Sequence, residues 1–179
     1  DKAETIPGPF TRFLSVWAKK LRCNIATTIH ESDKGRYYNT AFIVDRKGRI
    51  AGKYRKAHLT MSEMEAGILP GNKLDVFELD FGKVGFTTCW DNWFCESSRL
   101  LRLKGAEMIL FPLAGDVHGH LEHVWPARAI DNGIPLVVSV WQGEPEKPVP
   151  ARIIGGDGAV LAETTDALGY AFSEIDLNG

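Results

Sequence analysis

Cysteine is scarce in this chain: Cys23, Cys89 and Cys95 are the only three among 179 residues. An odd number at irregular spacing, with no Cys-X-X-Cys pair, does not fit a disulfide framework. Such a set is typical of proteins from a reducing compartment, so we expect a cytoplasmic location. Each cysteine is then available as a free thiol.

Long apolar runs and an excess of one charge are also absent. The longest apolar stretches, 108–113 and 134–141, are far shorter than the ~20 residues that a membrane-spanning helix needs. The formal net charge is −2 at pH 7, which indicates neither a nucleic-acid nor a membrane partner. No repeat or linker divides the chain, and its length suits one domain over residues 1–179.

The apolar pattern predicts an α/β fold in which strands outnumber helices. Apolar residues between Phe10 and Leu21 fall on one face of a helix, and further helices are expected at 96–103 and 121–131. Strands are expected at 24–30, 38–45, 49–54, 74–79, 83–89, 108–112, 134–140, 151–155, 159–163 and 170–176. Because hairpins are mixed with strand–helix–strand units, the pattern suits layered sheets covered by outer helices.

Residues 85–96 carry the strongest chemical signal. A predicted strand ends at Cys89, a tight turn follows, and a helix begins near Glu96. A nucleophile at a strand-to-helix turn points outward, and the backbone N–H groups after it are free to hold an oxyanion. A thiol suits this role because its thiolate is strongly nucleophilic. Taken alone, a free cysteine is more often a small buried apolar residue.

Lys56 lies in the second informative segment, 54–59, at the end of a predicted hairpin strand. An ammonium group there could stabilise a thiolate and later a tetrahedral oxyanion. Taken alone, a lysine after Tyr54 and Arg55 is usually a solvated surface charge.

Together these segments resemble the nitrilase, or carbon–nitrogen hydrolase, superfamily. The resemblance runs over almost the whole chain, in matching order, at 3–9, 38–41, 45–48, 54–56, 85–99, 105–107, 125–129 and 131–133. It implies an α-β-β-α sandwich of two mixed sheets with outer helices. It also implies hydrolysis of non-peptide carbon–nitrogen bonds in small amide, carbamoyl or nitrile substrates, without metal or organic cofactor, by a homodimer or larger homo-oligomer.

The resemblance assigns roles to individual residues of a Glu–Lys–Cys triad. Cys89 matches the nucleophile that forms a thioester, Lys56 matches the oxyanion-stabilising lysine, and the backbone N–H of Trp90 completes the oxyanion hole. A further glutamate follows the lysine in this family. Glu63 and Glu65 both lie in the right region, and we prefer Glu65.

One part of the family pattern is not matched. The general-base glutamate lies well upstream of the helix predicted over 10–21, and this chain begins after that position. We therefore expect a fold that is incomplete at its N-terminus, and a fragment that is poorly soluble alone. The alternative function is a non-catalytic scaffold or interaction protein that kept the fold and lost the base.

Three smaller features complete the sequence-based expectations. Asp91 follows Trp90, where amide-cleaving relatives commonly have aspartate, which favours amide or carbamoyl substrates over nitriles. Cys95 is expected to be a small buried residue. The segment 116–123 holds three histidines and two carboxylates, but its spacing matches no zinc pattern, so we expect a loop beside the substrate pocket and no metal site.

Overall fold

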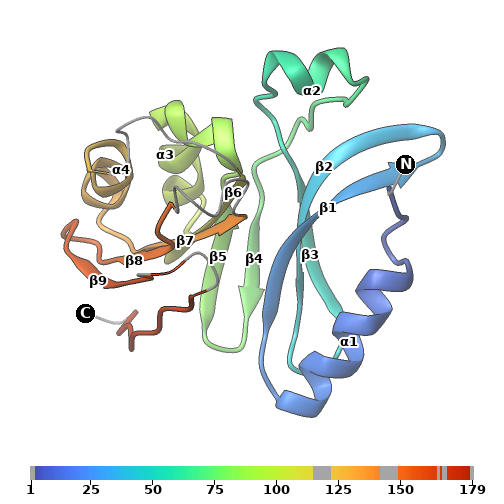
Figure 1. Ribbon diagram of the computed structural model, residues 1–179. Helices are drawn as coiled ribbons and strands as arrows, with labels where there is room; N and C mark the ends of the chain where they lie inside the picture. Colours follow the sequence, from blue (N-terminus) through green and yellow to red (C-terminus); the bar gives the residue numbers. More distant parts are fainter. Residues whose placement is uncertain (1–2, 115–121, 142–148, 165, 167–168, 178–179) are drawn as a thin grey trace.

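Two sheets form the centre of the molecule, for which a computed structural model describes residues 3–114, 122–141, 149–164, 166 and 169–177 (Figure 1). The first sheet is antiparallel and three-stranded, in the order β1 (Ile25–Asp33), β2 (Arg36–Val44) and β3 (Ile50–Arg55). The second has six strands, in the order β4 (Val76–Leu79), β5 (Gly82–Phe86), β6 (Met108–Ala114), β7 (Leu136–Trp141), β8 (Arg152–Ile154) and β9 (Val160–Glu163).

Helices cover the outer faces of both sheets. Helix α1 (Pro9–Leu21) lies along the first sheet, and α3 (Cys95–Leu103) and α4 (Val124–Asn132) lie on the second (Figure 1). A short helix α2 (Met61–Glu65) and a 3-10 helix η1 (Cys89–Trp93) belong to the connections. The predicted layering of helix, sheet, sheet and helix is thus confirmed. No helix within the described ranges is long and apolar enough to cross a membrane.

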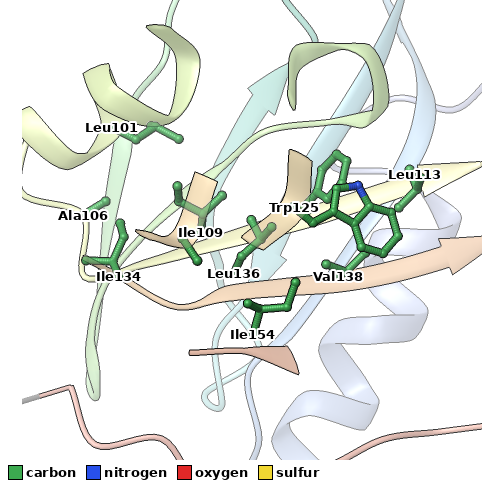
Figure 2. Close-up of a cluster of buried hydrophobic side chains, with 11 residues drawn as sticks. Leu101, Ala106, Ile109, Leu113, Trp125, Ile134, Leu136, Val138 and Ile154 are labelled. Atoms are coloured by element: carbon green, nitrogen blue, oxygen red, sulfur yellow. The ribbon is translucent and has the colours of Figure 1, made fainter. Parts of the chain in front are cut away.

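Each layer boundary is filled by apolar side chains. On β2, Phe42 and Val44 pack toward α1, whereas Ala41 and Ile43 pack toward the second sheet, because neighbouring residues of a strand point to opposite faces. The largest cluster lies between the second sheet and its helices (Figure 2). It contains Leu101, Ala106, Ile109, Phe111, Leu113, Trp125, Ala129, Ile134, Leu136, Val138 and Ile154.

The parallel part of the second sheet positions the site. Strands β5, β6 and β7 run parallel, with α3 in the first crossover and α4 in the second. Their carboxyl ends therefore meet at one edge of the sheet, which is where open α/β sheets commonly bind ligands. Thr88 and Cys89 follow the carboxyl end of β5 at this edge.

Three expectations about local structure are wrong. Strand β5 ends at Phe86 and not at Cys89. Cys89 itself has φ 48°, a conformation through which an extended strand cannot pass. Residues 170–176 form no strand, since none of the described strands pairs with this segment, and Tyr170 and Phe172 are exposed. Cys95 is exposed at the start of α3, where we expected a buried residue.

Candidate active site

Cys89 is the first residue of η1, directly after the buried residues Thr87 and Thr88. Its φ of 48° lies in the left-handed region, which costs a residue with a side chain about 1–2 kcal/mol. Such strain collects at functional sites, where the surrounding structure enforces it. The Cys89 side chain is partly buried, so its neighbours hold it in place but leave part of it exposed.

The turn at Cys89 is held by the carboxylate of Asp91, which is fully buried. Its Oδ2 accepts hydrogen bonds from the Thr88 N–H at 2.9 Å and the Tyr54 hydroxyl at 2.7 Å. Its Oδ1 accepts the His58 backbone N–H at 2.9 Å and lies 2.8 Å from His58 Nδ1. Burial, followed by the charge of Asp91, raises the pKa of the Tyr54 hydroxyl. One carboxylate thus joins the cysteine turn to the segment that contains Lys56.

Lys56 is almost completely buried, with 1% of its surface exposed. Its Nζ donates a hydrogen bond to Glu63 Oε2 at 2.6 Å, and its backbone N–H donates to the Asn39 carbonyl oxygen at 2.8 Å. A buried ammonium needs such a partner, because an unpaired charge away from water is costly. The solvated surface lysine considered from the sequence is therefore not what the structure shows.

Glu63 is the carboxylate that lies beside Lys56. It also accepts hydrogen bonds from the Asn39 amide at 2.8 Å and from the Thr60 N–H at 2.8 Å. Burial by itself raises the pKa of Glu63, but the hydrogen bonds from Lys56, Asn39 and Thr60 outweigh it, so that the pKa is lowered. Glu63 is thus held in its charged form.

Glu63, and not the preferred Glu65, lies beside Lys56. Thr60 caps α2, and the Glu63 side chain turns back toward that N-terminus and Lys56. Glu65 lies two residues further on, where the helix has turned by about 200°, and it is exposed. The structure brings together the segments of Cys89 and Lys56, and it brings Glu63, not Glu65, to Lys56.

The backbone N–H of Trp90 lies directly after Cys89. It belongs to the first turn of η1, whose leading N–H groups have no partner within the helix. It donates no hydrogen bond to the residues that the structure describes, whereas the next N–H, of Asp91, donates to the Thr88 carbonyl oxygen at 3.1 Å. The Trp90 and Trp93 rings lie 5.5 Å apart and are partly exposed beside the turn.

A cavity of about 560 Å³ lies between the two sheets at this edge. Asn39 of β2 and Thr88, the residue before Cys89, both line it. The remaining lining comes from 26–30 of β1, 112–114 of β6 and 139–141 of β7. Its volume is in the range of small-molecule sites.

The histidine-rich segment falls mostly outside the described residues, which exclude 115–121. Glu122, near the end of this segment, forms an ion pair with Arg152, and its Oε1 accepts a hydrogen bond from Arg152 at 2.8 Å. Within the described part of the chain, no group of three or more His, Cys, Asp or Glu side chains could hold a metal ion. The expectation about this loop is therefore untested.

The family model for carbon–nitrogen hydrolases matches residues 1–179. The chain belongs to the carbon–nitrogen hydrolase family. The resemblance deduced from the motifs is thus confirmed.

Several carbon–nitrogen hydrolases are similar to this chain in sequence. The nitrilase of Pyrococcus abyssi is 37% identical over 185 residues, which cover 98% of this chain and 68% of that protein. The citrullinase of Francisella tularensis is 29% identical over 194 residues, covering 100% of this chain and 66% of that protein. The omega-amidase NIT2 of Homo sapiens is 28% identical over 196 residues, covering 99% and 70%. This chain therefore spans about two thirds of the length of such relatives.

Solved carbon–nitrogen hydrolase structures share the fold. Nit3 of Saccharomyces cerevisiae, a member of branch 10 of the nitrilase superfamily, superposes with a TM-score of 0.83 at 25% identity, covering 92% of this chain and 63% of that one. The carbon–nitrogen hydrolase of Helicobacter pylori G27 gives 0.80 at 26% identity, covering 90% and 64%. The two-sheet architecture is therefore that of the family.

Proposed function

We propose that the full-length protein hydrolyses the carbon–nitrogen bond of a small amide or carbamoyl compound through a thioester on Cys89. The Cys89 sulfur attacks the carbonyl carbon, and the carbonyl oxygen becomes an oxyanion. The carbon–nitrogen bond then breaks, and ammonia leaves with the proton that the thiol lost. Water attacks the thioester, which releases the acid and restores the thiol.

The roles of the surrounding groups follow from charge. The oxyanion is stabilised by the Trp90 N–H and by the Lys56 ammonium, because both are donors fixed before the reaction begins. Glu63 holds the Lys56 ammonium in place through an ion pair of 2.6 Å. In the family pattern, proton transfer belongs to a glutamate upstream of α1, so the activity is proposed for the full-length protein.

The observation that carries this proposal is the carboxylate of Asp91, which fastens the turn of Cys89 to the segment of Lys56. The Cys89 backbone is strained, and Lys56 is buried with its charge, beside a cavity. Both features cost stability, so packing of the core alone does not explain them. The relatives named omega-amidase and N-carbamoylputrescine amidase favour amide and carbamoyl bonds. The relative named nitrilase makes nitriles an outcome that the assay must include.

We also propose that the protein is a homodimer or larger assembly, in the cytoplasm. The outer helices α3 and α4 expose Leu100, Leu103 and Ile130, and apolar surface of this kind supports association between copies. Sedimentation of the full-length protein would give the oligomer size.

The test of the activity is substitution of the nucleophile. Cys89→Ala in the full-length protein should abolish ammonia release from a panel of amides, carbamoyl compounds and nitriles. Cys23→Ala is the matched control, because Cys23 is also a partly buried free cysteine but lies after α1, in another part of the fold. It should keep full activity. If Cys89→Ala releases ammonia as fast as the wild type, the proposal is wrong. If the wild type acts on no compound, the scaffold alternative is favoured.

A further inference from the structure

The imidazole of His58 contacts η1 at two points, although His58 belongs to the segment that follows β3. Its Nδ1 lies 2.8 Å from Asp91 Oδ1, and its ring stacks on the Phe94 ring with 4.2 Å between the centres and 20° between the planes. Asp91 is the third residue of η1, and Phe94 follows the last. The ring therefore holds the part of η1 that follows Cys89 and Trp90.

The partners of Asp91 decide which ring nitrogen of His58 carries the hydrogen. The Asp91 carboxylate already accepts hydrogen bonds from the Thr88 N–H, the Tyr54 hydroxyl and the His58 backbone N–H. Three donors around one group are what an ionised carboxylate takes, because it can only accept. The Nδ1 of His58 is therefore a fourth donor, and Nε2 is the nitrogen that gains and loses a proton.

We propose that His58 is a positioning residue for the reaction of Cys89, because its Nδ1–H fixes the Asp91 carboxylate, which in turn fixes the turn of Cys89. This inference rests on the proposed function, since it uses Cys89 as the nucleophile. His58 is not among the described residues that line the cavity of about 560 Å³. Its effect is therefore on the rate of the chemical step and not on the binding of substrate.

The path from the ring to the cysteine turn is short. Oδ1 of Asp91 faces His58, and Oδ2 accepts the N–H of Thr88, the residue before Cys89. Without the Nδ1–H donor, Oδ1 keeps only the His58 backbone N–H, so the carboxylate is freer to rotate. The bond to the Thr88 N–H then weakens, and the φ of 48° at Cys89 is enforced less strongly. A reacting group that is misplaced by about 1 Å can cost about 100-fold in rate.

Exposure alone does not explain this arrangement. The His58 side chain is 36% exposed, so water could satisfy its ring nitrogens. Instead, the backbone N–H and the ring nitrogen both lie against one carboxylate oxygen, and the ring face lies on Phe94. These contacts restrict the ring to one orientation, which is what a residue that supports a reacting group needs.

Asparagine and glutamine at position 58 separate the two ring nitrogens. The asparagine NH₂ takes the place of the imidazole Nδ1, whereas the glutamine NH₂ takes the place of Nε2. His58→Asn in the full-length protein keeps the donor to Asp91, so its kcat should stay within about twofold of the wild type. His58→Gln loses that donor, so its kcat should fall by about 10-fold with KM unchanged. A melting curve for each variant allows kcat to be given per folded molecule.

A nitrogen-15 spectrum of the histidine rings tests the contact with Asp91 independently of any activity. In the full-length protein, the neutral ring of His58 should be the Nδ1–H tautomer. Its signals are assigned as those that disappear in His58→Asn. An Nε2–H tautomer would overturn the inference, because Nδ1 would then have no hydrogen to donate.

The outcomes distinguish this inference from the function beneath it. Cys89-dependent turnover with the wild-type kcat per folded molecule in His58→Gln overturns the role of His58 alone. The same holds if His58→Asn loses as much as His58→Gln, or if the loss appears in KM. Failure of the wild type on every amide, carbamoyl compound and nitrile, or turnover that survives Cys89→Ala, overturns the proposed function and this inference with it.

Discussion

Asp91→Asn keeps the shape of the residue that joins the cysteine turn to the lysine segment, but removes its charge. Each carboxylate oxygen faces two nitrogen or oxygen atoms, Thr88 N and Tyr54 Oη on one side and His58 N and Nδ1 on the other. An asparagine has one oxygen and one NH₂ group. Whichever way it is turned, its NH₂ therefore faces at least one N–H or O–H donor.

The size of the effect follows from these contacts. The least costly orientation turns the NH₂ toward His58, where a neutral imidazole can accept through Nδ1 while the His58 backbone N–H loses its partner. Leaving one such donor unpaired costs about 1–3 kcal/mol, and losing the charge weakens the other bonds. We expect a loss of about 2–4 kcal/mol in the free energy of unfolding. Because the turn of Cys89 is loosened, kcat/KM should fall by about 100-fold.

Urea unfolding and ammonia release by the full-length protein measure both effects. Asp80→Asn is the control, since Asp80 forms an exposed ion pair with Arg46 at 2.6 Å, and such pairs are worth about 0–1 kcal/mol. It should change neither quantity appreciably. An Asp91→Asn protein that unfolds at the wild-type urea concentration and keeps its activity would refute the proposed link between the two segments.

Two further predictions concern the other carboxylates. Glu63→Gln leaves the Lys56 ammonium buried without its counter-charge. The free energy of unfolding should therefore fall by about 3 kcal/mol and kcat/KM by about 100-fold. Glu65→Gln is the control, because Glu65 is exposed, and it should match the wild type in both assays. Glu31 is buried, which alone raises its pKa, but hydrogen bonds from Arg55, Lys53 and Thr40 lower the pKa to about 2. Because this pKa lies below its usual value of 4.5, the contribution of Glu31 is present above pH 4.5 and is lost as the pH falls toward 2. Glu31→Gln should flatten the fall of the urea midpoint over that range, and parallel curves for the two proteins would contradict the prediction.

Strands and helices with a clear period are predicted well from the sequence. The two strands expected at 38–45 and 49–54 occur as β2 and β3, Arg36–Val44 and Ile50–Arg55. Residues 41–44 of β2 are buried on both faces of the strand, and a short continuous apolar run is the signal of such a strand. The helix over Pro9–Leu21 is likewise found, and its Phe10, Leu14 and Ala18 belong to the cluster with Phe42 and Val44 of β2. Phe13, Trp17 and Leu21, which the same apolar pattern includes, are exposed.

Features that depend on distant contacts are not visible in the sequence. Asp91 is 37 residues from Tyr54 and 33 from His58, so no local pattern shows that one carboxylate holds both. Helix α2 has five residues, too few for a period, and without it the choice between Glu63 and Glu65 has no basis. The available signal is the position of Asp91 two residues after Cys89, and it suggests a substrate preference but not a structural link. The single domain over 1–179 stays a prediction.

Alkylation of Cys89 by iodoacetamide, followed by peptide mass spectrometry alongside the activity, tests most directly that this thiol acts on the substrate carbonyl. The background is Cys95→Ser in the full-length protein, since Cys95 is exposed and would react in any case. Cys89 should be modified before Cys23, activity should fall in step with its modification, and a saturating amide substrate should slow both. A protein that stays fully active after Cys89 is completely alkylated would contradict the proposed mechanism.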